Sequence, residues 1–379
     1  MKNMLRTESS FQNILVKHSE YLHTAGTAYT QTIQGKEHIM SITIKEVAQL
    51  AGVSPSTVSR TCTNHPSISE QTKEKVRKAM QELGYEPNTP IVAPNTKTIG
   101  IVLPVSEKDT YENSFFLETM RGISQFCNQK QYFTTFITGA STDEILQCIR
   151  QMSKEERLDG IILLYSSRQD PIVDYLYGEG IQFVIIGKAD KYIQDTIYID
   201  NDNIQAARDA TSYLISLGHT RIAYLGCDSA RIFSADRKSG YILALTEQNI
   251  PFRPEYYIEI PYIPYEDSEE LKKTLSMEER PTAFIANDDI HALVLAHTAS
   301  QMNLRIPEDL SIVSFNNSIA ARLTSPPLTS IDINSRQLGF EAASQIINHI
   351  ENPSLLPTKI IVPHHLVERK SCAAPEKLK

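Results

Sequence analysis

The chain has 379 residues, of which 41% are hydrophobic, and a formal net charge of −8. This length predicts two or three domains with ample core, and the acidic balance is unlike that of a general nucleic-acid coat. The five cysteines show no Cys-x-x-Cys spacing, and no apolar run approaches the roughly 18 residues of a membrane span. We therefore expect a cytoplasmic protein with reduced thiols and without a signal peptide.

Residues 1–39 are polar, show no helical stripe and precede Met40. Such a segment is either a disordered extension or lies before the physiological start of the protein. We assign it no function.

The segment 42–60 contains two short helical patterns joined by a turn with a glycine. Thr43 followed by Glu46 fits a capping box, which predicts a helix beginning near Ile44. Gly52 is expected to end it. This spacing suits a helix-turn-helix, in which one helix enters the major groove of DNA.

The second helix of this pair is predicted over residues 55–61. Ser54 can cap it and Pro55 suits its first position, where a missing N–H costs nothing. Its short polar side chains and one arginine suit contacts to phosphates and base edges. The outward-facing residues are Pro55, Ser56, Thr57, Ser59 and Arg60.

A third helix is predicted from Ser69, as its cap, to Leu83, with Gly84 as the terminating residue. Val76, Met80 and Leu83 form its predicted buried stripe. Residues 40–88 therefore form a small all-α domain of three helices. The alternative from the residues alone is an ordinary helical hairpin.

The sequences TIKEVAQLAGVSPSTVSR and ISEQTKEKVRKAMQELGYEPN closely resemble the DNA-binding headpiece of the lactose and galactose repressor (LacI/GalR) family. The resemblance implies a homodimeric transcriptional regulator, expected to be a repressor, on double-stranded operator DNA. It implies that Pro55, Ser56 and Arg60 read bases, with Ser56 and Arg60 carrying most of the direct readout. It also implies a DNA interface that includes Thr43, Thr57, Ser59, Asn64, Tyr85 and Asn88.

The segment 89–97 occupies the position of that family's hinge helix. It is about three residues shorter than usual by this resemblance, and Pro94 would stop any turn begun at Pro90. Ile91 or Val92 is the candidate to replace the leucine that wedges into the minor groove.

After residue 97, short apolar runs alternate with amphipathic helical stretches. This alternation predicts an α/β architecture of parallel sheets covered on both faces, and the length favours two doubly wound lobes. The strand-like runs are 98–103, 132–138, 160–165, 183–187, 221–226, 283–286 and 310–315.

The core also resembles that family's effector-binding domain, which has the architecture of periplasmic sugar-binding proteins. The landmarks include NSFFLETMRGI and IDNDNIQAARDATSYLISLGHTRIAYLG. By this resemblance lobe one holds 98–199 and 334–352, and lobe two holds 203–330 and 358–371, followed by a tail at 372–379. Three crossings between the lobes would permit closure on a ligand.

Polar residues follow several predicted strands, where α/β sheets bind their ligands. The resemblance places Arg237, Asp288 and Asn316 at the effector, beside Asn287, and offers Phe115 and Phe116 for stacking on a sugar. The family usually has Asp at position 316. The structural alternatives are core packing for the phenylalanines and a surface ion pair or helix cap for Arg237 and Asp288.

Within the family the core looks most like maltose-operon repressors of low-GC Gram-positive bacteria, which implies a sugar such as maltose as effector. The alternatives are a catabolite-control regulator with a phosphoprotein corepressor, or a sugar-binding protein that does not bind DNA. We expect no enzyme activity, catalytic residue, cofactor or metal. His291 and His297 are six residues apart on a predicted helix, so they cannot share a metal ion.

Overall fold

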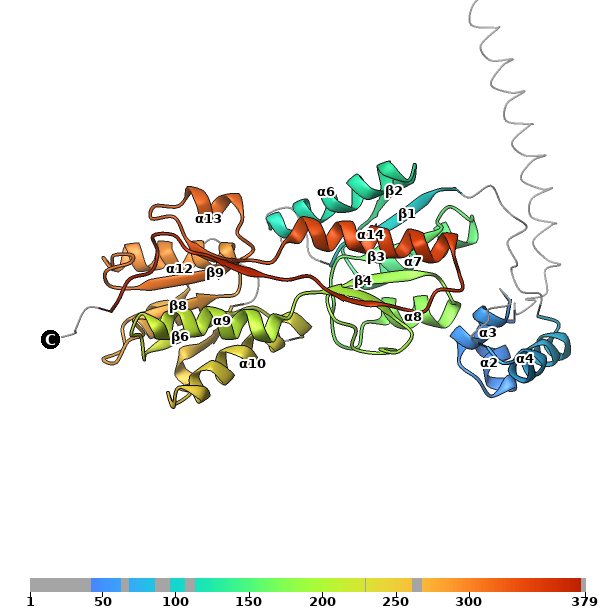
Figure 1. The fold of residues 1–379 in the computed structure, drawn as a ribbon, viewed down its shortest axis with the longest axis horizontal. Helices are drawn as coiled ribbons and strands as arrows, with labels where there is room; N and C mark the ends of the chain where they lie inside the picture. Colours follow the sequence, from blue (N-terminus) through green and yellow to red (C-terminus); the bar gives the residue numbers. More distant parts are fainter. Residues whose placement is uncertain are drawn as a thin grey trace, which may run out of the picture. The chain divides into compact units, whose positions relative to one another are not determined.

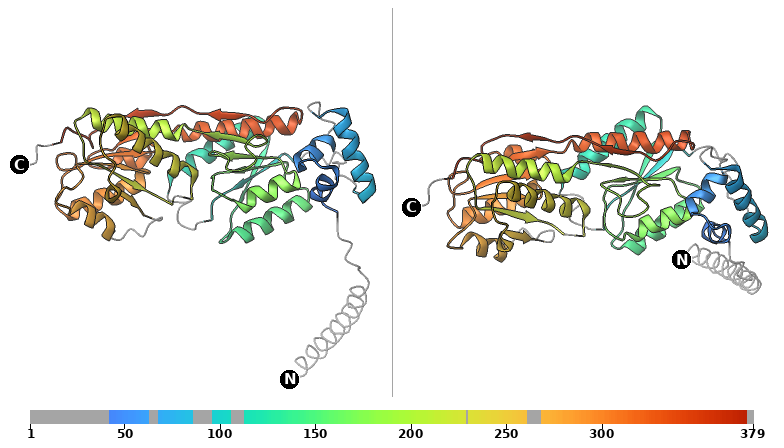
Figure 2. Two further views of the ribbon diagram at one scale, coloured as in Figure 1. Left: turned by 90° about the horizontal axis from the view of Figure 1, so that it is seen from below. Right: turned by 60° about the horizontal axis from the view of Figure 1, so that its bottom comes forward.

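The computed structural model describes residues 42–62, 68–85, 96–105, 113–228, 230–260 and 268–375 (Figures 1 and 2). The predictions for residues 1–39, Asn64, Asn88 and most of the hinge segment lie outside these ranges. In the described part of the chain, no helix is long and apolar enough to cross a membrane.

The small amino-terminal domain consists of α2 (Ile44–Ala51), α3 (Pro55–Cys62) and α4 (Glu70–Leu83), which confirms the three predicted helices. Their ends follow local signals. The Ser54 hydroxyl accepts from the Thr57 N–H at 3.2 Å, and Ser69 caps α4 by accepting from the Thr72 N–H. Gly84 ends α4 with a φ of 66°, a left-handed conformation that glycine adopts without strain. Buried apolar residues, among them Val58, hold the helices together.

Lobe one is built on a six-stranded parallel sheet in the order β11-β5-β4-β3-β1-β2. Helices α6 and α14 cover one face of this sheet, and α7 and α8 cover the other (Figure 1). The elements are β1 (Thr98–Val102), α6 (Ser114–Gln129), β2 (Phe133–Ile137), α7 (Thr142–Lys154), β3 (Gly160–Leu163), α8 (Pro171–Glu179), β4 (Phe183–Ile186), β5 (Ile197–Asp200), α14 (Ser335–Glu351) and β11 (Lys359–Ile361).

Lobe two has a second six-stranded sheet in the order β12-β10-β9-β8-β6-β7, parallel except for β12. Helices α9 and α10 pack on one face, and α11, α12 and α13 on the other. The elements are α9 (Asn203–Ser216), β6 (Ile222–Gly226), α10 (Ile232–Glu247), β7 (Tyr257–Glu259), α11 (Glu269–Leu275), β8 (Ala283–Ala286), α12 (Asp289–Gln301), β9 (Ser311–Phe315), α13 (Ile319–Leu323), β10 (Thr329–Asp332) and β12 (His365–Val367). Two doubly wound lobes were predicted and are confirmed.

The expected boundary of lobe two at residue 358 is wrong. Strand β11 pairs in parallel with β5, so residues 359–361 belong to lobe one, and only β12 joins the sheet of lobe two. The family resemblance alone predicts that boundary, because the short, half-exposed strands of this segment carry no apolar run that distinguishes one sheet from the other. The third crossing therefore lies between β11 and β12.

Helices α6 and α14 run side by side in close contact (Figure 2). A Cβ added at Gly339 would lie 2.0 Å from the Thr119 carbonyl oxygen, and one at Gly122 would lie 2.0 Å from that of Arg336. Glycine is therefore required at both positions, because any side chain would push the backbones apart. This contact fixes α6, whose first turn reaches the cleft.

Candidate effector cleft and DNA-reading helix

The residues predicted to read DNA lie on α3, in the second position of the helix-turn-helix. Ser56 and Thr57 bond through their hydroxyls to the Ser54 hydroxyl at 2.8 and 2.9 Å. Arg60 lies in the last turn, and its guanidinium is 3.4 Å from the Asp195 carboxylate. Pro55, Ser59, Thr43 and Tyr85 are also partly exposed. The structure thus brings the described residues of this set to one small domain, and their contact with DNA stays a prediction.

A cavity of about 410 Å³ is lined by residues from both lobes. It lies at the carboxyl ends of β5, β6, β8 and β9, where ligands of α/β sheets bind. All six residues predicted to contact effector line this cavity, namely Phe115, Phe116, Arg237, Asn287, Asp288 and Asn316. The sequence therefore predicted their convergence correctly, although their binding of an effector stays a prediction.

Arg237 is buried in the floor of the cavity, with 4% of its surface exposed. Its Nε donates to Asn203 at 2.9 Å, and its Nη1 donates to the Asn287 carbonyl oxygen at 2.6 Å. The guanidinium also lies 4.0 Å from the centre of the Phe315 ring. Burial lowers the pKa of Arg237 from its usual value. These contacts use two of its five N–H donors, so a fixed cation remains able to donate to a ligand.

Asp288 caps α12 and also faces the cavity, so one part of the structural alternative, a helix cap, is correct for it. Its Oδ1 accepts from the His291 N–H at 2.9 Å and contacts His291 Nδ1 at 2.7 Å. Its Oδ2 accepts from the Asn113 side chain of lobe one at 3.2 Å. The same Asn113 accepts from Asn316 at 3.4 Å. Polar groups from both lobes therefore meet at this end of the cavity.

Phe115 and Phe116 form the apolar side of the cavity from the first turn of α6. Their ring centres are 5.2 Å apart in an edge-to-face arrangement. Phe116 is buried in the core of lobe one, whereas Phe115 is partly exposed and touches the cores of both lobes. This pair of phenylalanines therefore both packs in the core and lines the cavity.

Comparisons with known proteins agree with this arrangement. Residues 43–88 match the model of bacterial regulatory proteins of the lacI family, and residues 211–372 match that of the periplasmic binding protein-like domain. The transcriptional regulator MalR of Streptococcus pneumoniae is 36% identical over 87% of this chain and 100% of its own length. The chain belongs to the LacI family.

Two solved structures of this kind share the fold. The probable maltose operon transcriptional repressor of Staphylococcus aureus matches with a TM-score of 0.67 and 30% identity, over 73% of this chain and 98% of that one. The complex of the transcriptional regulator CelR with cellobiose matches with a TM-score of 0.70 and 26% identity, over 87% and 99%.

Several residues that line the cavity of this LacI-family chain were not anticipated. Asn113 caps α6 by accepting from the Phe115 N–H, and its place directly before the two phenylalanines was an available signal. Asp200 ends β5, a short strand that the apolar pattern did not reveal. Burial raises the pKa of Asp200 to about 7, although its Oδ1 accepts from the Asn201 N–H and from Asn203.

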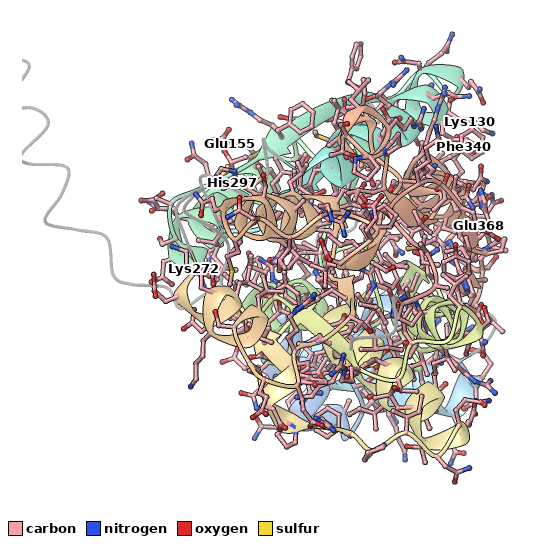
Figure 3. All side chains as sticks on the ribbon, turned by 90° about the vertical axis from the view of Figure 1, so that its left-hand side faces the viewer. Lys130, Glu155, Lys272, His297, Phe340 and Glu368 are labelled. Carbon is pink, nitrogen blue, oxygen red and sulfur yellow. The ribbon has the colours of Figure 1, made fainter. Side chains whose placement is uncertain are left out.

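The two histidines of α12 lie in different environments. His291 is buried against Asp288, whereas His297, labelled in Figure 3, is exposed. That the two histidines cannot share a metal ion stays a prediction. Among the residues that the structure describes, no group of three or more His, Cys, Asp or Glu side chains could hold a metal ion.

Proposed function

We propose that this chain is a cytoplasmic transcriptional repressor whose affinity for operator DNA is controlled by a sugar bound between the lobes. A homodimer would place its two α3 helices on a near-palindromic operator. The observation that supports this most strongly is one chain that combines a helix-turn-helix with a cavity formed by both lobes.

The chemistry of the cavity suits a sugar. Carbohydrates present hydroxyl groups around the edge of the ring and C–H groups on its faces. Arg237, Asp288 and Asn287 offer charged and amide partners for the hydroxyls, and Phe115 offers an aromatic surface for the C–H groups. A volume of about 410 Å³ lies within the usual range for small-molecule sites, which is about 300–1,000 Å³.

Maltose is the first candidate effector. The S. aureus relative is named for a maltose operon, and the CelR structure holds the disaccharide cellobiose. We infer that this chain binds an α-linked glucose disaccharide, with cellobiose as the comparison that tests the linkage.

Contacts between the lobes provide a route from the cavity to the rest of the molecule. Asn113 joins Asp288 at 3.2 Å, and Lys188 pairs with Asp236 at 3.4 Å. A ligand that replaces or adds to these contacts changes the free energy of one lobe arrangement relative to another. If each arrangement of the lobes holds the DNA-binding headpieces of the dimer differently, the operator affinity changes with the lobe arrangement.

The test is a capture of genomic DNA fragments by the full chain, repeated with maltose, with cellobiose and without sugar. We expect one set of operator-like fragments to be retained without sugar and released by maltose. Retained fragments that share no preferred sequence would contradict sequence-specific binding. Retention that none of the sugars changes would contradict effector control.

A catabolite-control regulator that uses a phosphoprotein corepressor is the second candidate. For such a protein, a phosphoprotein would strengthen operator binding and maltose titrated by calorimetry would give no heat. Saturable maltose binding together with operator release favours the first candidate.

A further inference from the structure

The turn that carries Asn316 into the cleft has an unfavourable backbone. Asn316 has a φ of 94° and Asn317 a φ of 48°, both positive and both in residues that possess a Cβ. Asparagine adopts positive φ more readily than other residues with a Cβ, but the φ of Asn316 lies beyond the usual left-handed range of about 50–70°, and such a conformation needs surrounding contacts to hold it. The turn connects β9 to α13, and its Asn316 side chain points toward Asn113 of the opposite lobe.

A buried carboxylate holds this turn from behind. The Ser318 N–H donates to Oδ2 of Asp289 at 2.6 Å. The hydroxyls of Ser314 and Ser330 donate to its Oδ1 at 2.5 and 3.0 Å. Asp289 is 2% exposed, and bonds of this kind to a buried carboxylate are stronger than those between neutral groups.

Ser330 extends the same network to Asn317. Its hydroxyl accepts from the Asn317 N–H at 3.0 Å while it donates to Asp289. Each of the two backbone amides that follow Asn316 is therefore fixed, directly or through Ser330, to one carboxylate. Burial also raises the pKa of Asp289, which shows how fully this carboxylate is withdrawn from water.

Two consecutive aspartates at the start of α12 thus make contacts on opposite sides. Asp288 lines the cavity and bonds to Asn113, whereas Asp289 is not among the lining residues and faces the turn. The contacts that hold the turn of Asn316, among them the bond from the Asn316 N–H to the Ile331 carbonyl oxygen, therefore include a carboxylate that does not line the cavity.

We propose that Asp289 is a positioning residue of the effector site, which holds the strained Asn316–Ser318 turn so that Asn316 faces the ligand. This inference rests on the proposed binding of a sugar in the cleft. It predicts that effector affinity depends on Asp289 entirely through Asn316, and that loss of the carboxylate loosens the turn even without a ligand.

The first experiment needs no ligand and uses the full chain. Hydrogen exchange should be about tenfold faster at the amides of residues 317–323 in Asp289→Asn than in the wild type, while the strands β6 and β8 keep their protection. Ser330→Ala is a milder second variant with the same expected pattern. Asp309→Asn is the matched control, because Asp309 is a carboxylate of the same lobe that bonds to Arg305 instead. Unchanged exchange in the turn in both Asp289→Asn and Ser330→Ala would overturn the proposal, whether or not any sugar binds.

The second experiment is a double-mutant cycle read by calorimetry with maltose, and with cellobiose in a parallel arm. Asp289→Asn should weaken binding about tenfold in the wild-type background and change it less than twofold when Asn316 is already alanine. Equal losses in both backgrounds would reveal a general structural role and overturn the proposal. Absence of binding of either sugar to the wild type would count against the proposed function, and the exchange experiment would then decide the role of Asp289 alone.

Discussion

The side-chain amide of Asn113 donates to the carboxylate of Asp288 at 3.2 Å, and this bond joins lobe one to lobe two at the cavity. The two residues are the N-caps of α6 and α12, and they lie 175 positions apart in the chain. A ligand hydroxyl at this place would meet a carboxylate and two amides already arranged for hydrogen bonding.

Asp288→Ala should weaken maltose binding by roughly 1.5–3 kcal/mol, because a charged acceptor is lost from the site. Operator affinity without sugar should change by no more than the loss of the one Asn113–Asp288 bond between the lobes allows, and release should need at least about tenfold more sugar. Calorimetry measures the first quantity and gel shifts the others. Asp288→Asn serves as the control, since asparagine caps a helix as well as aspartate and separates the lost charge from the lost cap. Unaltered sugar affinity in both variants would place the site elsewhere.

Arg60→Ala should lower operator affinity by about 1–3 kcal/mol if the guanidinium pairs with a base edge. Sugar binding should not change, because the cavity residues are separate from α3. A gel shift on the captured operator gives the measurement. Lys78→Ala removes the same charge from an exposed site on α4 and should have a smaller effect. Equal affinity of wild type and Arg60→Ala would contradict the assigned role of α3.

The free energy of unfolding should depend on pH through Asp200. Burial raises the pKa of this carboxyl to about 7 in the folded chain, above its usual value near 3.8. The folded state therefore binds the Asp200 proton more tightly than the unfolded state does. The stabilisation that results is fully present below the unfolded pKa near 3.8 and is lost as pH rises through 7. The slope should reach at most about 1.4 kcal/mol per pH unit between pH 4 and 7.

Asp200→Asn provides the comparison for that measurement. The remaining amide oxygen can still accept from the Asn201 N–H and from Asn203, since both bonds go to Oδ1. Urea unfolding from pH 5 to pH 7.5 should show the wild type losing stability relative to the variant as pH rises. Parallel curves for the two proteins would show that Asp200 titrates as it does in the unfolded chain.

Gly339→Ala should destabilise lobe one by about 1–3 kcal/mol or more, because the new methyl group would lie 2.0 Å from the Thr119 carbonyl oxygen. Thermal unfolding of the full chain measures the change. Gln337→Ala introduces the same residue at an exposed position of α14 and should be nearly neutral. A Gly339→Ala protein as stable as the wild type would mean that α6 and α14 can separate at no cost.

The sequence by itself determined the helices of the small domain, because their signals are local. Ser54, Ser69 and Gly84 act on neighbouring backbone groups, so their caps could be predicted without the fold. The buried strands β1, β3 and β8 were also predictable, since strands buried on both faces are continuously apolar.

Tertiary structure alone decided where the chain crosses between the lobes and which side chains meet in the cavity. Strands β5 and β11 are short and partly polar. Their pairing depends on which lobe the chain returns to before β11, and their own sequences do not show this. For the same reason the sequence did not reveal Asp200 or the bond from Asn113 to Asp288. Side chains distant in sequence become neighbours only when the ends of several strands converge, and no local pattern records that convergence.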